Sequence, residues 1–264
     1  MKQPLSSHVI AERSKLFAHY VDGLRQSLDS MPWSELHETV HAIVTAWATG
    51  HHVFVLGNGG SASTASHLAC DLSKNTAQPG LPAMRAVSLN DNMAIFSALA
   101  NDLGYEQVFA QQIQTLAQPY DVVLAISASG NSPNVLNGLR IAAERRATTI
   151  ALCGNPLGKM VSMVDIAMVT ASESVEQIED LHLMIAHIIT VAVRNEMQAE
   201  VARTISRLTP MPINGYANGA GNGAGNGYGN GALNGNGASG ESESANPAAA
   251  EMRRTTHKPT TSAA

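Results

Sequence analysis

Short apolar runs alternate with amphipathic stretches between residues 51 and 204. Runs of this length are typical of buried strands, whereas the intervals between them carry the 3.6-residue period of helices. Strands that alternate with helices predict an α/β fold, with a parallel sheet covered by helices on both faces. The predicted strands are 51–57, Arg85–Leu89, Asp121–Ser127, Thr148–Cys153 and Asp165–Thr170, and the helices between them are Ser61–Ser73, 91–100, 105–117, 132–146 and 157–162.

Three further helical segments flank this alternating region. Residues 5–30 and 34–49 precede the first strand, and Gly50 gives the second segment a C-terminal stop. Because these two helices have little sheet left to cover, we expect them to pack against another subunit. The long apolar-periodic segment Glu176–Thr204 is predicted to form the last helix.

The C-terminal stretch differs sharply in composition from the rest of the chain. Half of the 22 glycines lie between Asn214 and Gly240, where an asparagine followed by glycine recurs every fourth residue. Such a segment buries too little apolar surface to offset the entropy of ordering its backbone, about 1–2 kcal/mol per residue. We therefore predict that residues 213–264 form a disordered tail.

Composition excludes several classes of function. The net charge of −5 gives no support for a nucleic-acid-binding surface, so we expect no direct nucleic-acid partner. No run of 18 apolar residues occurs, which argues against a membrane-spanning segment. Two cysteines, Cys70 and Cys153, are too few for a disulfide framework, so a reducing, cytoplasmic setting is expected, with both side chains buried and inert.

Two glycine- and serine-rich turns follow predicted strands and precede predicted helices. GNGGS spans Gly57–Ser61, and SASGNS spans Ser127–Ser132. Both turns therefore lie at the carboxyl ends of parallel strands, where open α/β sheets bind ligands. Glycines let the backbone approach an anion, and the unpaired N–H groups of a helix N-terminus donate to it. The pair of turns favours a phosphate site.

Four segments resemble the sugar isomerase (SIS) domain family in order and spacing: GNGGSASTASHLACDL, NDNMAIFSALANDLGYEQVF, ISASGNSPNVL and IEDLHLMIAHI. The subgroup that they resemble is phosphoheptose isomerase. The resemblance implies a three-layer, flavodoxin-like sandwich with a five-stranded parallel sheet in residues 51–208. It also implies that the helices of residues 1–50 pack on this domain and on the oligomer, a homotetramer that takes a phosphorylated sugar.

The resemblance assigns roles to particular positions of this sequence. His67 and His187 match two zinc-binding positions of the family, and Asp71 stands where a Glu is typical. Glu179 stands where a Gln is typical, which makes His67, Asp71, Glu179 and His187 the expected ligands of one zinc ion. Asp71 and His187 also take the positions of the catalytic base and its acid–base partner. The expected sugar-phosphate contacts are Asn58, Gly59, Ser61, Asp102, Ser127, Ser129 and Ser132.

The spacing of these candidate ligands is compatible with a metal site. His67 and Asp71 are four residues apart and so share one helix face, and Glu179 and His187 lie two turns apart on the last helix. Two imidazoles and two carboxylates suit zinc or another divalent ion. His182 remains an alternative to His187, and His51 and His52 are expected to be ordinary surface residues.

The leading hypothesis is an aldose–ketose isomerase that interconverts sedoheptulose 7-phosphate and D-glycero-D-manno-heptose 7-phosphate through an enediol(ate) intermediate. Such a reaction needs a base, a proton donor and stabilisation of developing negative charge. One alternative is a non-catalytic SIS protein, either a phosphosugar-binding protein or an adaptor like the subgroup that binds the bacterial replication initiator DnaA. Another is an isomerase that acts on a different sugar phosphate.

Overall fold

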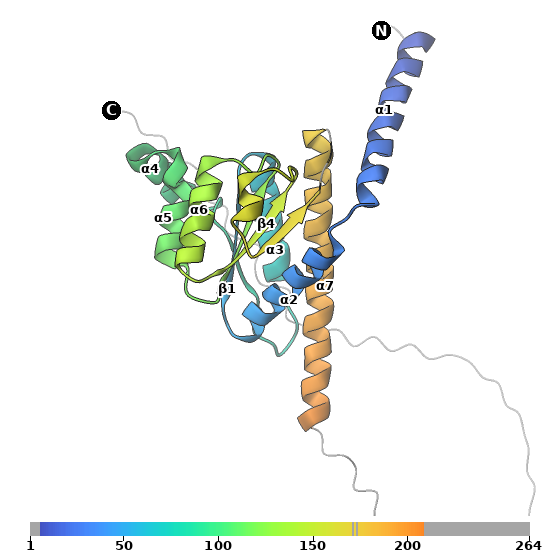
Figure 1. The fold of residues 1–264 in the computed structure, drawn as a ribbon. Coiled ribbons are helices and arrows are strands. Elements are labelled where there is room, and N and C mark those ends of the chain that lie inside the picture. The colour runs from blue at the N-terminus through green and yellow to red at the C-terminus, as the bar shows by residue number, and fades with distance from the viewer. Residues whose placement is uncertain (1–5, 171, 173, 209–264) are drawn as a thin grey trace, which may run out of the picture. The chain divides into compact units, whose positions relative to one another are not determined.

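The computed structural model describes residues 6–170, 172 and 174–208, and the predicted tail of residues 213–264 lies outside this part of the chain. The described residues form an α/β fold (Figure 1). In chain order the elements are α1 (Ser7–Leu28), α2 (Trp33–Ala48), β1 (His52–Gly57), α3 (Gly60–Lys74), β2 (Arg85–Ser88), α4 (Met93–Leu103), η1 (Tyr105–Gln107), α5 (Val108–Leu116), β3 (Val122–Ser127), α6 (Pro133–Glu144), β4 (Thr148–Cys153), η2 (Lys159–Ser162), β5 (Ile166–Val169) and α7 (Val175–Leu208).

The five strands form one sheet in the order β2-β1-β3-β4-β5, and every pair is parallel. All five predicted strands are therefore confirmed, as is the α/β class. From β1 the chain continues to β2, which lies on one side of β1 within the sheet, and then crosses back to form β3 on the other side of β1. The direction of the strand order therefore reverses between β1 and β3. Gly57 pairs with Ile126, and the two predicted ligand-binding turns consequently lie side by side.

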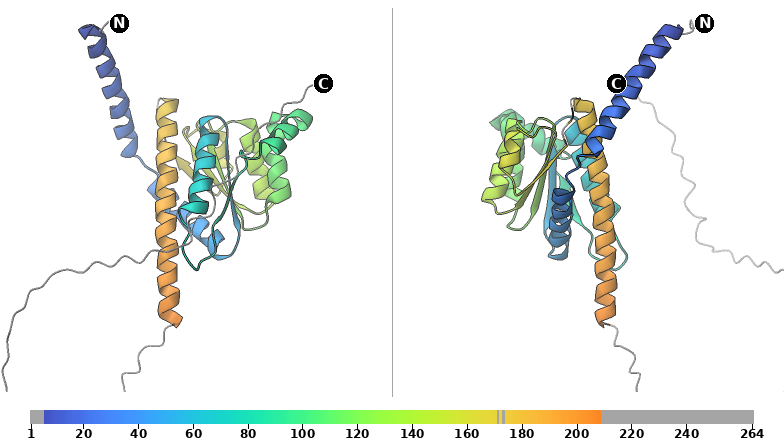
Figure 2. Two further views of the ribbon diagram at one scale, coloured as in Figure 1. Left: turned by 180° about the vertical axis from the view of Figure 1, so that it is seen from behind. Right: turned by 45° about the vertical axis from the view of Figure 1, so that its right-hand side comes forward.

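Helices cover both faces of the sheet and enclose two apolar cores. On one face α2, α3 and α7 pack over strand residues such as Val55 and Leu124, and on the other α4, α5 and α6 pack over Phe54 and Val123. Alternate residues of each central strand thus point into opposite cores, because successive side chains of a strand face opposite sides. Figure 2 shows α3 and α7 side by side on their face.

The placement of α2 corrects one expectation. Its residues Leu36, Ile43 and Trp47 are buried in the core that β1, β3 and α7 share. The premise that the N-terminal helices have little sheet left to cover is therefore wrong for α2, which covers its own sheet, and its contact with another subunit stays a prediction. The sheet has room for this third helix because β4 and β5 extend the face beyond α3.

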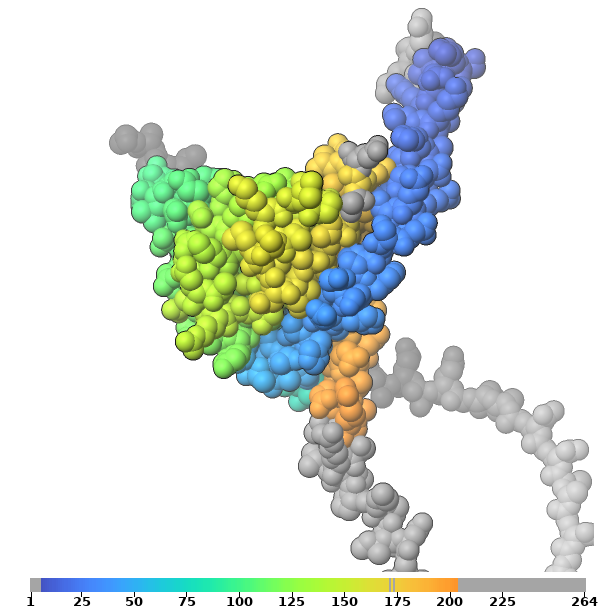
Figure 3. Space-filling model, viewed as in Figure 1, coloured from blue at the N-terminus to red at the C-terminus, as the bar shows by residue number. Residues whose placement is uncertain are grey.

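Helix α1 behaves differently from α2. None of its residues is buried, and the apolar side chains Ile10, Phe17, Val21 and Leu28 are exposed. In Figure 3 this helix forms the blue ridge at the edge of the visible face. These exposed side chains give α1 an apolar face that the described part of the chain leaves without a partner.

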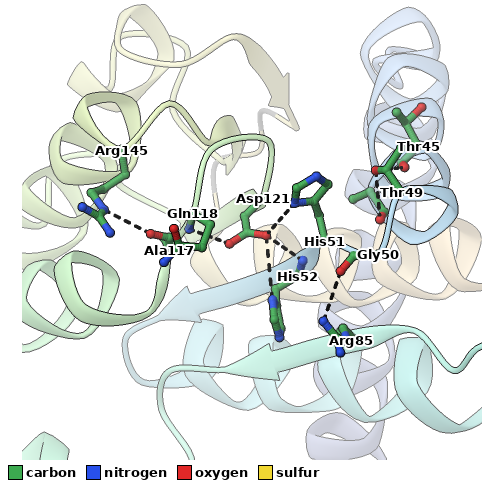
Figure 4. Close-up of polar contacts among 11 residues, drawn as sticks. Thr45, Thr49, Gly50, His51, His52, Arg85, Ala117, Gln118, Asp121 and Arg145 are labelled. Atoms are coloured by element: carbon green, nitrogen blue, oxygen red, sulfur yellow. Dashed lines mark hydrogen bonds and ion pairs between the residues drawn. The ribbon is translucent and has the colours of Figure 1, made fainter.

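A buried aspartate fixes the edge of the sheet that is opposite the two turns (Figure 4). Asp121 is 1% exposed and precedes β3. One carboxylate oxygen accepts the backbone N–H of His52 at 2.8 Å, and the other accepts that of Gln118 at 2.7 Å. The Nδ1 atom of His51 lies 3.4 Å from the same carboxylate. His51 and His52 are therefore half-buried partners of Asp121, not ordinary surface residues.

Three smaller differences separate prediction from structure. The predicted helix 105–117 is divided into the 3₁₀ turn η1 and α5, and the predicted helix 157–162 is only the 3₁₀ turn η2. Cys70 is exposed on α3, although Cys153 is buried as expected. Among the described residues, no helix is long and apolar enough to cross a membrane.

Candidate functional site

The first turn connects β1 to α3 through Asn58 and Gly59. Gly59 has a φ of 55°, a left-handed conformation that glycine adopts without strain. The strand end itself is held by Asn90, whose side chain accepts the N–H of Gly57 at 3.2 Å and donates to its carbonyl oxygen at 2.8 Å. The backbone of the turn is thus fixed from the neighbouring β2–α4 loop.

Asn58 bridges the two turns. Its side-chain amide exchanges two hydrogen bonds of 2.8 Å with the amide of Asn134, in the first turn of α6. The hydroxyl of Tyr105 also donates to Asn58 Oδ1, at 2.9 Å. Asn58 was predicted to contact the sugar phosphate, and in this structure it ties β1, η1 and α6 together. Sequence reasoning missed Asn134, although its position in SPNVL at a helix start was a usable signal.

The second turn runs from Ser127 to Ser132 between β3 and α6. The Ser127 hydroxyl accepts the N–H of Gly130 at 3.2 Å, and the Ser129 hydroxyl accepts that of Asn131 at 3.3 Å. Gly130 has a φ of 66°, and a Cβ at this position would lie 2.6 Å from the Cys153 sulfur. The turn therefore tolerates only glycine there, and α6 begins directly after Ser132.

The two turns present a mixed polar surface to solvent. Ser129 and Gly59 are exposed, Ser132 and Asn58 are partly exposed, and Ser61 is 5% exposed at the start of α3. The helices α3 and α6 both begin at these turns, so their unpaired N–H groups point towards the same edge of the sheet. Hydroxyl and N–H donors without a formal charge are the groups that bind phosphate at such helix starts.

A second polar cluster lies where α3 and α7 pack together. The Nε2 atoms of His67 and His187 are 3.1 Å apart, and Asp71 Oδ2 lies 3.4 Å from His67 Nε2. These three ligand atoms lie within 4.8 Å of one another. The other oxygen of Asp71 accepts a hydrogen bond of 2.7 Å from Asn75, which turns Oδ2 towards the two imidazoles.

The donor set and spacing fit a zinc ion. Zn–N bonds of about 2.0–2.1 Å at a tetrahedral angle hold two imidazole nitrogens roughly 3.3 Å apart, close to the separation of the two histidines here. His67 lies seven residues after Gly60, which is about 10 Å along the helix. The cluster is therefore near the first turn but not part of it.

Glu179 lies apart from this cluster. A Cβ on Gly60 would overlap both carboxylate oxygens of Glu179, so this carboxylate rests on the first residue of α3 instead of facing the two histidines. A negative charge in that position is favourable because it meets the positive end of the helix dipole. The structure brings together His67, Asp71 and His187 of the four predicted ligands.

Two other candidates have clear positions. Asp102 is exposed near the end of α4, and its carboxylate accepts a hydrogen bond of 2.8 Å from Asn101. His182, the alternative to His187, is 1% exposed, and neither ring nitrogen has a hydrogen-bond partner among the described residues. Burial lowers the pKa of His182 to about 4, so this imidazole is neutral near pH 7, and it lies outside the cluster.

The sequence of this chain is similar to a known domain family and to individual proteins of that family. The model of the SIS domain matches residues 17–154. A phosphoheptose isomerase from Helicobacter pylori is 35% identical over 177 residues, which are 66% of this chain and 90% of its own length. One from Pelobacter propionicus is 42% identical over 147 residues, 56% of this chain and 77% of its own.

Solved structures agree with the sequence relatives. The structure of a phosphoheptose isomerase from Francisella tularensis is 25% identical, with a TM-score of 0.65, and the match covers 72% of this chain and 100% of the other. The phosphoheptose isomerase structure from Neisseria gonorrhoeae is 24% identical, with a TM-score of 0.64, and the match covers 71% of this chain and 99% of the other. The second likeness shows the fold, which includes the five-stranded sheet and both layers of helices.

Proposed function

The chain belongs to the SIS domain family, and from this premise we propose that it is an isomerase of sedoheptulose 7-phosphate, with D-glycero-D-manno-heptose 7-phosphate as product. The observation that carries the proposal is the cluster of His67 and Asp71 on α3, the helix that leaves the first turn, with His187 on α7. Phosphoheptose isomerases that are 35% and 42% identical to this chain support the choice of substrate.

The two turns are proposed to hold the phosphate end of the sugar. Ser61, Ser127, Ser129 and Ser132 supply hydroxyls, and the N-termini of α3 and α6 supply N–H groups. Gly59 lets the backbone approach the anion, and Asp102 is proposed to contact the sugar chain. Binding energy from this remote end positions the reacting carbons and so contributes to the rate, although the phosphate takes no part in the chemistry.

The reaction moves a proton between C1 and C2 of the sugar. Asp71 is proposed to take the proton from carbon. Asn75 donates its hydrogen bond to Oδ1 of Asp71, so that Oδ2 is turned towards the cluster. His187 is proposed to exchange a proton with the sugar oxygen, since an imidazole nitrogen can either donate or accept a proton. His67 lies between the two and orients both, at 3.4 Å from Asp71 and 3.1 Å from His187.

We propose that the same cluster holds zinc, with Glu179 as a fourth ligand after a change of its side-chain rotamer. A bound zinc ion supplies Lewis-acid stabilisation of negative charge on the sugar oxygens. Asp71 and Glu179 would give the ion two carboxylate ligands, whereas a Gln at position 179 would leave only one. With two carboxylate ligands the ion would have less net positive charge, so a weaker Lewis acid is expected.

We also propose that the protein assembles as a homotetramer in the cytoplasm. The unpartnered apolar side chains of α1 support an assembly in which a second copy of the chain covers them. The two free cysteines, Cys70 and Cys153, agree with a reducing compartment.

Purified protein tested for metal content and for turnover of sedoheptulose 7-phosphate decides between the candidates. We expect Asp71→Asn to lower kcat at least 100-fold with little change in KM, because the carboxylate base is lost. Ser129→Ala should raise KM, because it removes a hydroxyl from the second turn. Glu144→Gln, an exposed carboxylate paired with Arg140 on α6, is the matched control and should behave as the wild type.

One outcome would contradict the isomerase proposal, and another would contradict only the role given to Asp71. Saturable binding of the sugar phosphate without turnover would support the non-catalytic phosphosugar-binding alternative. Turnover that survives Asp71→Asn at the wild-type rate would remove Asp71 from its role and leave the base to be found elsewhere.

A further inference from the structure

The helical turn Gln177–Asp180, which begins two residues after the start of α7, touches three segments that are far apart in the sequence. A Cβ on any of three glycines would overlap it: Gly23 in α1, Gly60 at the start of α3, and Gly154 after β4. The hydroxyl of Tyr20 in α1 also donates to it. Because a glycine lies at each of these three contacts, the turn packs directly against backbone on three sides.

On the α1 side the contact is polar and fully paired. Gln177 is 7% exposed, and its amide donates to the carbonyl oxygen of Tyr20 at 2.8 Å while accepting from the Ser172 hydroxyl at 2.5 Å. A Cβ on Gly23 would lie 2.5 Å from this amide nitrogen. The Tyr20 hydroxyl donates to Asp180 Oδ2 at 2.6 Å. Tyr20 therefore holds the turn through both its backbone and its side chain.

On the other side the same turn supports both glycine turns of the candidate site. Glu179 rests on Gly60, the residue with which α3 leaves the first turn. Ile178 packs on Gly154, with its Cγ2 atom 2.5 Å from an ideal Cβ there. The N–H of Gly154 in turn donates to the carbonyl oxygen of Ala128, inside the second turn, at 3.2 Å. One helical turn thus braces two loops that come from different strands.

These contacts join α1 to the site. No residue of α1 is buried, and a groove of about 750 Å³ separates part of α1 from the start of α7. Figure 2 shows α1 approaching α7 at the N-terminal end of α7. Any displacement of α1 would therefore act on the residues that support the two glycine turns.

We propose that Tyr20 is a positioning residue for the phosphosugar site: by holding Gln177 and Asp180 it fixes the turn on which both glycine turns rest, so that the docking of α1 sets the affinity for phosphate. This inference rests on the proposed assignment of the two turns to phosphate. Tyr20 acts only through α7 and touches no substrate.

Two substitutions test the proposal by different routes. Tyr20→Phe removes only the hydroxyl, and Gly23→Ala places a methyl group against the Gln177 amide. Alanine is the better helix former, so Gly23→Ala strengthens α1 itself while it disturbs the contact. If α1 has a purely structural role, Gly23→Ala should leave phosphate affinity unchanged or improve it. If Tyr20 and α1 position the site, Gly23→Ala should lower the affinity for phosphate.

The readouts are the affinity for inorganic phosphate, measured by calorimetry, and the KM and kcat for sedoheptulose 7-phosphate. We expect both variants to weaken phosphate binding and raise KM by about three- to tenfold, the range for net loss of one ordinary hydrogen bond, with kcat within twofold. Asp180→Asn keeps an acceptor for Tyr20 and should retain wild-type affinity, whereas Asp180→Ala should match Tyr20→Phe. Lys15→Gln is the control, because Lys15 pairs only with Glu12 on the same helix among the described residues.

The outcomes separate this inference from the proposed function. Wild-type phosphate affinity and KM in both Tyr20→Phe and Gly23→Ala would overturn the positioning role, whatever the turnover. Weakened phosphate binding in these variants, in a protein that turns over no heptose phosphate, would support the positioning role and contradict the isomerase. A wild-type protein that binds neither phosphate nor the sugar phosphate would overturn both.

Discussion

At the scale of single residues, burial decides the properties of His182. The side chain is 1% exposed, and burial lowers its pKa from 6.5 to about 4, opposed in part by the nearby backbone of Cys153. The unfolded chain therefore binds this proton near pH 6.5, whereas the folded chain binds it only near pH 4. Since the unfolded state holds more protons between these values, stability falls as the pH falls through this window.

The expected cost in unfolding free energy at pH 5 is about 2 kcal/mol relative to pH 7.5, because folding lowers the pKa of His182 from 6.5 to about 4. We expect His182→Leu to lose about that much less stability than the wild type over the same interval, because the titrating group is gone. Urea unfolding at the two pH values measures the difference, and His41→Gln, an exposed histidine of α2, is the control. Equal losses of unfolding free energy in the wild type and in His182→Leu would contradict the assignment of this pH dependence to His182.

The sequence predicted that His67 and Asp71 lie together, but it did not predict the contacts that hold the two turns. His67 and Asp71 could be paired from their spacing alone, because a helix brings residues four apart onto one face. The reciprocal amide bonds of Asn58 and Asn134 could not, because 76 residues separate the two partners. The position of Glu179 depends on a rotamer and on the absence of a side chain at Gly60, and neither can be derived from a spacing along α7.

At the scale of elements, the order and type of the strands followed from sequence, because each buried strand is a short apolar run between helical patterns. The place of α2 did not follow. Its pattern indicates one apolar face, and a one-dimensional pattern does not say whether that face meets its own sheet or another chain. The 3₁₀ turn η1 was missed because residues 105–117 keep a continuous apolar periodicity across the change of geometry.

Asp121 makes a contact between elements whose loss should measurably lower the free energy of unfolding. Its two carboxylate oxygens accept the N–H groups of His52 and Gln118 and so join the start of β1 to the loop before β3. We expect Asp121→Asn to lower the free energy of unfolding by about 1–3 kcal/mol, because an amide leaves one of these N–H groups facing another donor.

The site lies at the opposite edge of the sheet, so phosphate affinity per folded molecule should be unchanged in Asp121→Asn. Urea unfolding and phosphate titration of the same preparation test both statements, with Glu144→Gln as the exposed control. An unchanged unfolding midpoint would show that the carboxylate contributes nothing to the folded state.

At the scale of the whole molecule, α1 has two faces of different character. Tyr20 and Gly23 face α7, whereas Ile10, Phe17, Val21 and Leu28 are spaced by seven, four and seven residues and share another side of the helix. The first face is polar and connects to the site through Gln177 and Asp180. The second is apolar and exposed, so contact with a second copy of the chain would order α1 and thereby act on the site.

We therefore expect Phe17→Glu to reduce the size of the assembly, because Phe17 is 63% exposed in a single chain and a carboxylate on the apolar side of α1 opposes its burial. Light scattering after size-exclusion chromatography should give the wild type a mass near four times the 27.7 kDa of one chain, and the variant a smaller, concentration-dependent mass. Lys15→Gln changes the charge by the same amount away from the apolar side and should leave the mass unaltered. A wild type that is monomeric at micromolar concentration, or a variant that retains the wild-type mass, would show that the apolar side of α1 is not the contact that assembles the protein.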